Sequence, residues 1–234
     1  TFAYNRPRIG GSEDDNQLPT IDHIADILKQ TLLIKGLNPP YILVGHSWGA
    51  AYIRTYASLY PDEIAGLIFV DPHDFVKKAV GGRSCYKEIG LTQKQIDSLF
   101  AEYDKSADEY MAQGPKFVVE EMKAQREFGK TGYELCNRIP LPDVPVHFIM
   151  AGGYPFIYEK TAALYDHEKM FRINNDIKME NWLQLINPLK FGKFFYCSNS
   201  GHMIPKDDPD IIISSIKLAL NDFERLKIEK TTLK

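Results

Sequence analysis

The chain has 234 residues, of which 44% are apolar and 25% charged, and its formal net charge at pH 7 is −3. This length and composition suit one globular domain with a substantial core and room for an insertion. The near-neutral charge argues against nucleic acid or an acidic membrane surface as the main partner. No apolar run approaches the roughly 18 residues of a membrane span.

Three cysteines, Cys85, Cys136 and Cys197, lie far apart and without metal-ligand spacing. We interpret them as reduced core or cap residues and expect neither a metal nor a cofactor. A Cys85–Cys136 disulfide stays open, because the compartment is not determined. No signal peptide is visible, which slightly favours a cytoplasmic location, although the chain begins at Thr1 without Met. The oligomeric state is not determined either.

The first elements follow one another closely. Residues 1–4 resemble a short strand, and the Pro/Gly-containing segment 5–12 is a turn region that excludes a helix. Apolar residues recur at three and four positions after Thr20 and stop before Gly36, so a helix is expected there.

An apolar strand pattern over 41–44 runs directly into Gly45-His46-Ser47-Trp48-Gly49, and a small-residue helix pattern follows to about Tyr60. A Gly-x-Ser-x-Gly turn between a strand and a helix is typical of a nucleophile elbow, in which the serine has a strained backbone. We expect glycine at both Gly45 and Gly49 because a side chain at either would collide with the adjoining strand or helix. The Ser47 hydroxyl then points out of the turn, at a helix N-terminus that favours developing negative charge.

The remaining chain alternates strands and helices around one long interruption. Continuous apolar runs predict strands over 64–70, 144–151 and 191–197, with a helical region within 157–187 and a closing helix over about 209–226. Such alternation predicts an α/β fold with a mostly parallel sheet flanked by helices. Residues 75–143 are polar, with helices expected at about 92–112 and 115–129, and are too long for a simple connection. They are interpreted as an inserted helical cap.

A serine hydroxyl becomes a nucleophile only when a base takes its proton and a carboxylate orients that base. His202 follows the last predicted strand in a Ser-Gly-His turn and is the candidate base for Ser47. The competing histidines are His23, His46, His73, His147 and His167; we expect His46 to point away from the serine and His147 to be a core residue.

The candidate acid is Asp71, at the end of the strand that follows the elbow, with Asp74 and Glu159 as alternatives. Capping of a turn before Pro72 would also explain Asp71. The backbone N–H of Trp48 is the expected oxyanion donor. No His-Gly motif that would supply a second donor precedes Ser47.

Several segments together resemble the α/β-hydrolase fold family. Residues 4–12 resemble the family's Tyr-(Asp/Asn)-Arg-Pro-Gly loop, 45–49 its elbow, 60–72 the segment entering its strand six, and 200–209 its histidine loop. Some members, including haloalkane dehalogenases, place the catalytic acid after strand six, which by analogy supports Asp71. The resemblance implies a core in two parts, residues 1–74 and 144–234, around a cap at 75–143.

Two features depart from the family pattern. The turn after the penultimate strand, residues 151–156, contains no carboxylate. Strands one to three of the family's sheet also have no counterpart, which would leave residues 1–4 without a neighbour. We therefore expect the sequence to be the C-terminal four-fifths of a longer protein, or a gene fragment, and to lack one oxyanion donor.

A serine nucleophile, rather than aspartate, argues against epoxide hydrolysis or dehalogenation and favours cleavage of a carboxylic ester, thioester or lactone of a small, largely apolar molecule. Cap aromatics would cover the pocket or form the cap's own core. They are Phe75, Tyr86, Phe100, Tyr103, Tyr110 and Phe117. One alternative is a proline iminopeptidase-like aminopeptidase, with Glu120 and Glu121 as candidates for holding a substrate amine. Another is a non-catalytic small-molecule binding module, or an inactive fragment.

Overall fold

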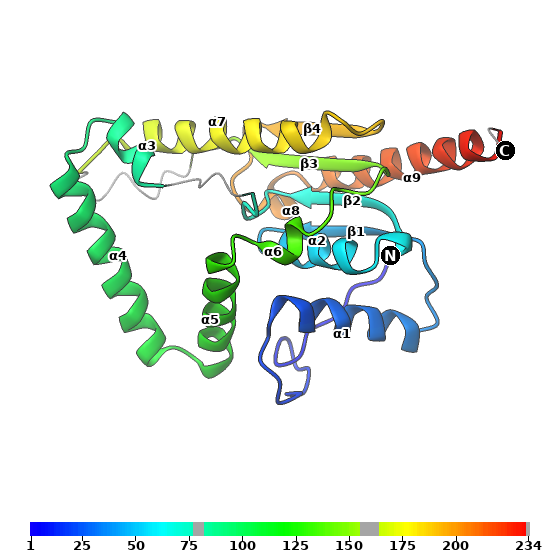
Figure 1. Ribbon diagram of the computed structural model, residues 1–234, viewed down its shortest axis with the longest axis horizontal. Coiled ribbons are helices and arrows are strands. Elements are labelled where there is room, and N and C mark those ends of the chain that lie inside the picture. The colour runs from blue at the N-terminus through cyan, green and yellow to red at the C-terminus, as the bar shows by residue number, and fades with distance from the viewer. Residues whose placement is uncertain (77–81, 155–163, 233–234) are drawn as a thin grey trace.

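A computed structural model describes residues 1–76, 82–154 and 164–232. Its centre is a four-stranded parallel sheet in the order β1-β2-β3-β4 (Figure 1). The strands are β1 (Tyr41–His46), β2 (Ile64–Val70), β3 (Val146–Ala151) and β4 (Gly192–Cys197). β2 and β3 are buried at every position, as expected of central strands covered on both faces. The predicted α/β fold with a parallel sheet is confirmed.

Helices cover both faces of this sheet, because alternate residues of each strand point to opposite sides. On one face, α1 (Ile21–Ile34), α2 (Gly49–Leu59) and α7 (His167–Ile186) pack against side chains such as Phe69 and Phe148. On the other face, α9 (Pro209–Thr232) packs against Ile68 and Ile149. A short 3₁₀ helix, Pro61–Glu63, leads into β2.

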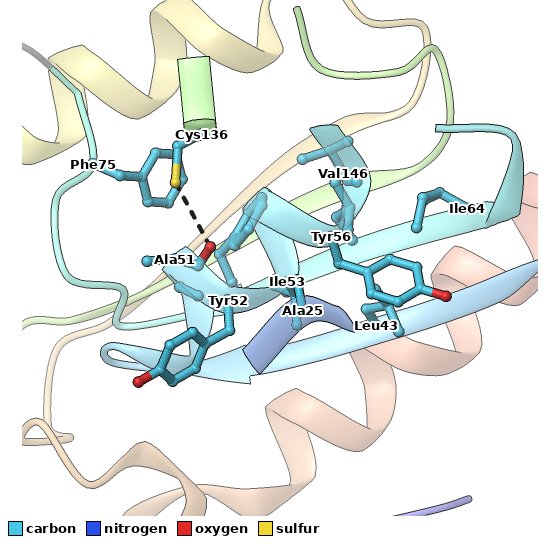
Figure 2. Close-up of a cluster of buried hydrophobic side chains, with 14 of the residues drawn as sticks. Ala25, Leu43, Ala51, Tyr52, Ile53, Tyr56, Ile64, Phe75, Cys136 and Val146 are labelled. Carbon is cyan, nitrogen blue, oxygen red and sulfur yellow. Dashed lines mark hydrogen bonds between the residues drawn. The ribbon is translucent and has the colours of Figure 1, made fainter. Parts of the chain in front are cut away.

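The larger of these cores surrounds α2. Figure 2 shows Ile53 and Tyr56 of this helix among side chains of the sheet and of α1, and Ala51 on the side of Cys136, whose thiol donates to the Ala51 carbonyl oxygen. Ala50, Ala51 and Ala57 are fully buried, and their small side chains let the helix approach the sheet closely. The start of α2 is therefore held firmly, and that is where the elbow lies.

Between β2 and β3 the chain forms a separate group of helices, α3 (Arg83–Glu88), α4 (Gln93–Gln113), α5 (Lys116–Lys130) and α6 (Glu134–Asn137). In Figure 1, α4 and α5 project away from the sheet. Thr92 caps the start of α4 with a capping box. Its side chain accepts from the Gln95 N–H, and the Gln95 side chain accepts from the Thr92 N–H. The helices predicted over 92–112 and 115–129 are confirmed.

Two expectations about the chain were wrong. Residues 1–4 form no strand, because no strand of the described sheet pairs with them, and Phe2 stacks on Tyr4 instead. The closing helix runs to Thr232 rather than 226, since no Gly or Pro interrupts it. The expectation of reduced cysteines is confirmed: Cys85 and Cys136 form no disulfide, and all three cysteines are free and buried. None of the helices in the described parts of the chain combines the length and apolarity needed to cross a membrane.

Candidate active site

The turn between β1 and α2 has the geometry of an elbow. Ser47 has a φ of 53°, a strained value for a residue with a side chain, and its N–H donates to the Val70 carbonyl oxygen at 3.0 Å. A Cβ at Gly45 would lie 2.5 Å from the Gly49 carbonyl oxygen, so only glycine fits there. The same expectation for Gly49 was wrong: a Cβ there meets nothing within 4 Å.

Two consecutive hydrogen bonds join Ser47 to His202 and His202 to Asp71. The Ser47 Oγ is 3.0 Å from His202 Nε2, and His202 Nδ1 is 2.6 Å from Asp71 Oδ2. With the Nδ1 proton donated to the carboxylate, Nε2 is free to accept the hydroxyl proton. These residues follow β1, β4 and β2, whose carboxyl ends meet at one edge of the parallel sheet.

Asp71 is fixed by β3 and is only 7% exposed. Its backbone N–H donates to the Ile149 carbonyl oxygen at 2.7 Å, and its Oδ1 accepts from the Ala151 N–H at 3.2 Å. Oδ2 is thereby left for His202. The Asp71 φ of 35° is a further strained value, sustained by these contacts on both sides of the residue.

The loop that carries His202 is tied to the protein mainly through its backbone. The Ser200 carbonyl oxygen accepts from the Gly153 N–H at 2.9 Å, and the Gly201 N–H donates to Asp207 Oδ2 at 3.0 Å. A short helix, α8 (Ile204–Asp207), follows, and Ile204 is fully buried. Asp207 was missed from the sequence, because an acid six residues after a loop glycine gives no motif.

Trp48 contributes two features beside Ser47. Its backbone N–H donates to no other group in the described part of the chain, so it is available to an oxyanion. Its indole ring lies 4.4 Å from the ring of His73, whose Nε2 is 2.9 Å from the Tyr133 hydroxyl. His73 in turn donates its backbone N–H to the Ser47 carbonyl oxygen at 3.0 Å.

The alternative acids lie elsewhere. Asp74 Oδ2 accepts from Asn181 at 3.1 Å and Oδ1 from the Val76 N–H at 2.9 Å, and burial raises the pKa of this carboxyl. Asp74 therefore links its loop to α7 and makes no hydrogen bond to His202. Glu159 lies outside the described residues.

The remaining histidines have other surroundings. His23 pairs with Asp15 at 2.7 Å, and His147 is fully buried with Nδ1 2.8 Å from Ser215 Oγ. His167 begins α7 beside Tyr165, with ring centroids 4.2 Å apart. His46 makes no hydrogen bond to the Ser47 hydroxyl; its Nε2 contacts the backbone carbonyl oxygen of His202 at 2.7 Å.

Glu120 and Glu121 on α5 are both occupied by arginines of the N-terminal loop. Glu121 accepts from Arg6 at 2.9 Å and from the Tyr52 hydroxyl at 2.8 Å, while Glu120 pairs with Arg8. Burial, with Glu121 alongside, raises the pKa of Tyr52, which keeps its hydroxyl a donor. Neither glutamate is free to hold a substrate amine. The small cavity bordered by Arg6, Arg8 and Phe117 is lined by none of Ser47, Asp71 and His202.

The six candidate pocket aromatics are distributed over different surroundings. Phe75 is buried in the main core, and Tyr86 and Phe100 pack in a separate cluster that α3 and α4 form with α7. Tyr103, Tyr110 and Phe117 are exposed. None of the six has a described contact with Ser47 or His202.

A parallel sheet with a strained serine between its first described strand and the following helix defines the class of the fold. Residues 1–166 match the model of the α/β-hydrolase fold. Because that match covers most of the chain, the chain belongs to the α/β-hydrolase fold family.

Individual similarities are remote. An uncharacterized protein of Schizosaccharomyces pombe is 22% identical over 169 residues, which are 64% of this chain and 31% of that protein. YqjL of Bacillus subtilis is 24% identical over 216 residues, 90% of this chain and 69% of YqjL. The chain thus spans about a third of the first relative. The structure of an α/β superfamily hydrolase from Oenococcus oeni is similar with a TM-score of 0.53 and 14% identity, covering 93% of this chain and 79% of that one.

Proposed function

We propose that this protein is a serine hydrolase that cleaves a carboxylic ester, thioester or lactone of a small, largely apolar substrate through an acyl-enzyme. The observation that carries the proposal is the chain of hydrogen bonds Ser47–His202–Asp71, at 3.0 and 2.6 Å. Membership of the α/β-hydrolase fold family supports the reaction class without defining the substrate.

In the proposed reaction, Ser47 Oγ attacks the substrate carbonyl while His202 Nε2 takes its proton. The negative charge that develops on the carbonyl oxygen is stabilised by the Trp48 N–H and by the N-terminus of α2. Protonated His202 then gives its proton to the leaving group, and Asp71 stabilises the imidazolium in between. Water enters with His202 as base and releases the acyl group. The side chain of His202 is 55% exposed, which leaves water a direct approach.

Labelling with a fluorophosphonate tests the proposal, because this probe reacts only with an activated serine. We expect one covalent adduct at Ser47, measured by intact-mass and peptide mass spectrometry. Ser47→Ala should abolish it and His202→Ala should reduce the labelling rate by several orders of magnitude. Ser58, a buried serine of α2, provides the matched control: Ser58→Ala should label like the parent protein.

The two alternatives predict different results. An aminopeptidase would hydrolyse amino-acid arylamides with a free α-amine faster than matched acyl esters, although Arg6 and Arg8 already occupy the candidate glutamates. A binding module would fold and yet remain unlabelled. Absence of an adduct on protein with an intact unfolding transition would therefore contradict the hydrolase proposal.

A further inference from the structure

His46 stands directly before the proposed nucleophile, and its side chain is turned toward the loop of the proposed base. Its Nε2–H donates to the backbone carbonyl oxygen of His202 at 2.7 Å. The two imidazole rings also lie side by side, with centroids 4.7 Å apart and planes inclined by 38°. Consecutive residues of the elbow thus contact His202 at two places, His46 at its backbone and Ser47 at its ring.

Side-chain packing alone does little to fix the position of the His202 loop. The side chain of His202 is more than half exposed, and the following residue, Met203, is 52% exposed, so packing contributes little to fixing either. On the preceding side, Gly201 is held by Asp207. On the following side, His46 is the described side chain that bonds the His202 carbonyl. The peptide groups on both sides of the imidazole are therefore anchored.

We propose that His46 is a positioning residue for His202, setting the backbone from which the imidazole spans Ser47 and Asp71. The catalytic consequence rests on the proposed serine hydrolase function, whereas the positioning itself is a property of the folded protein. A displacement of about 1 Å at a catalytic group can cost on the order of 100-fold in rate. Without His46 the loop keeps its hydrogen bonds at Ser200, Gly201 and Met203 and the buried Ile204, but the His202 carbonyl loses its side-chain donor, and a shift of this size there would displace the imidazole.

The test uses two amides of different length. In His46→Gln the side-chain nitrogen reaches the place of the imidazole Nε2, whereas in His46→Asn it reaches only the place of Nδ1. The rate of fluorophosphonate labelling at Ser47 should fall about 10- to 100-fold in His46→Asn and return to within a few-fold of the parent in His46→Gln. His23→Gln, which alters a histidine paired with Asp15 away from the site, is the control and should label at the parent rate.

A second readout does not depend on activity. The His202 Nδ1–H that is donated to Asp71 should give a downfield proton resonance in NMR spectra, which is lost in His202→Ala. We expect it to be present in the parent and in His46→Gln, and broadened or absent in His46→Asn. Should the parent protein not label at all, the proposed function fails and this resonance alone decides the role of His46.

Two results would overturn the inference. One is a His46→Asn protein with the parent's labelling rate and resonance. The other is an equal loss in both variants that follows a lowered thermal midpoint, which would make His46 an ordinary stabilising residue.

Discussion

Asp71 and Asp74 are two carboxylates in the same loop with different partners. Asp71 receives the Ala151 N–H on one oxygen and His202 on the other, while Asp74 is bound by Asn181 and the Val76 N–H. Sequence spacing alone left both open as the acid. The direction of each side chain, set by β3 and α7 respectively, separates them.

Replacing each aspartate by asparagine tests this separation. In Asp71→Asn the amide can donate to His202 and so favour the wrong tautomer, and we expect the labelling rate of Ser47 to fall by about 10⁴-fold. Asp74→Asn should label close to the parent rate. Rates are measured by quenched time courses with a fluorophosphonate. Equal losses in the two variants would contradict the assignment of Asp71.

His147 shows how burial changes the acid–base behaviour of a residue outside the site. It is fully buried in β3, its Nε2 has no partner among the described residues, and only Nδ1 is bonded, to Ser215. Burial, together with the nearby Lys193, lowers the pKa of His147 to about 4. The folded protein therefore keeps this ring neutral at a pH where the unfolded chain, with a histidine pKa near 6.5, is protonated.

The sign of the resulting pH dependence follows from this difference. The contribution of neutral His147 to the free energy of unfolding is complete above about pH 6.5. It falls as the pH drops toward 4, because only the unfolded state takes up the proton. The loss reaches about 3 kcal/mol once both states are protonated. His147→Asn keeps a partner for Ser215 at the place of Nδ1 but cannot titrate, so its free energy of unfolding in urea should decline less between about pH 7 and pH 4.5. Parallel curves for parent and variant would rule out this contribution.

At the scale of elements, the junction of β1 and α2 combines the positive φ of Ser47 with a close backbone approach at Gly45. The turn at Ser47 brings the carbonyl of Gly49 against the α-carbon of Gly45, and the buried alanines of α2 let helix and sheet approach closely. The two glycines of the motif thus differ in their surroundings. Only the first is required by contact in this structure.

Alanine at each glycine tests this difference. Gly45→Ala places a Cβ 2.5 Å from a backbone oxygen that cannot move without opening the turn, so we expect a loss of at least about 2 kcal/mol in the free energy of unfolding. Gly49→Ala meets open space at the start of a helix and should change stability by less than about 1 kcal/mol. Urea unfolding followed by circular dichroism measures both. Similar losses at the two positions would refute the argument.

For the whole molecule, α5 is joined to the N-terminal loop and to α2 by charged contacts across long sequence distances. Arg6 donates to Glu121 at 2.9 Å and to the Tyr52 hydroxyl at 3.0 Å, and Tyr52 donates to the same glutamate. Arg8 pairs with Glu120 one residue before. One face of α5 is thereby attached to both the N-terminal loop and α2.

Glu121→Gln should loosen this attachment, because the arginine and the tyrosine lose their common charged acceptor. We expect faster hydrogen–deuterium exchange in α5, with exchange in the buried strand β2 unchanged. Arg126→Gln is the control: its pair with Asp108 on α4 is exposed and 3.4 Å long, and should contribute little. Unchanged exchange of α5 in Glu121→Gln would contradict a role of this glutamate in holding the helix.

Sequence by itself determined the α/β class, the sheet strands and the elbow, because periodicity and the Gly-x-Ser-x-Gly turn are local properties of the chain. It also singled out Ser47, Asp71 and His202 as candidates, since residues after parallel strands gather at one edge. Only the tertiary structure decided the contacts that join distant segments, such as His46 to the His202 carbonyl and Arg6 to Glu121. It likewise decided that residues 1–4 form no strand, because a strand requires a partner. Backbone contacts and long-range ion pairs leave no spacing pattern in a sequence.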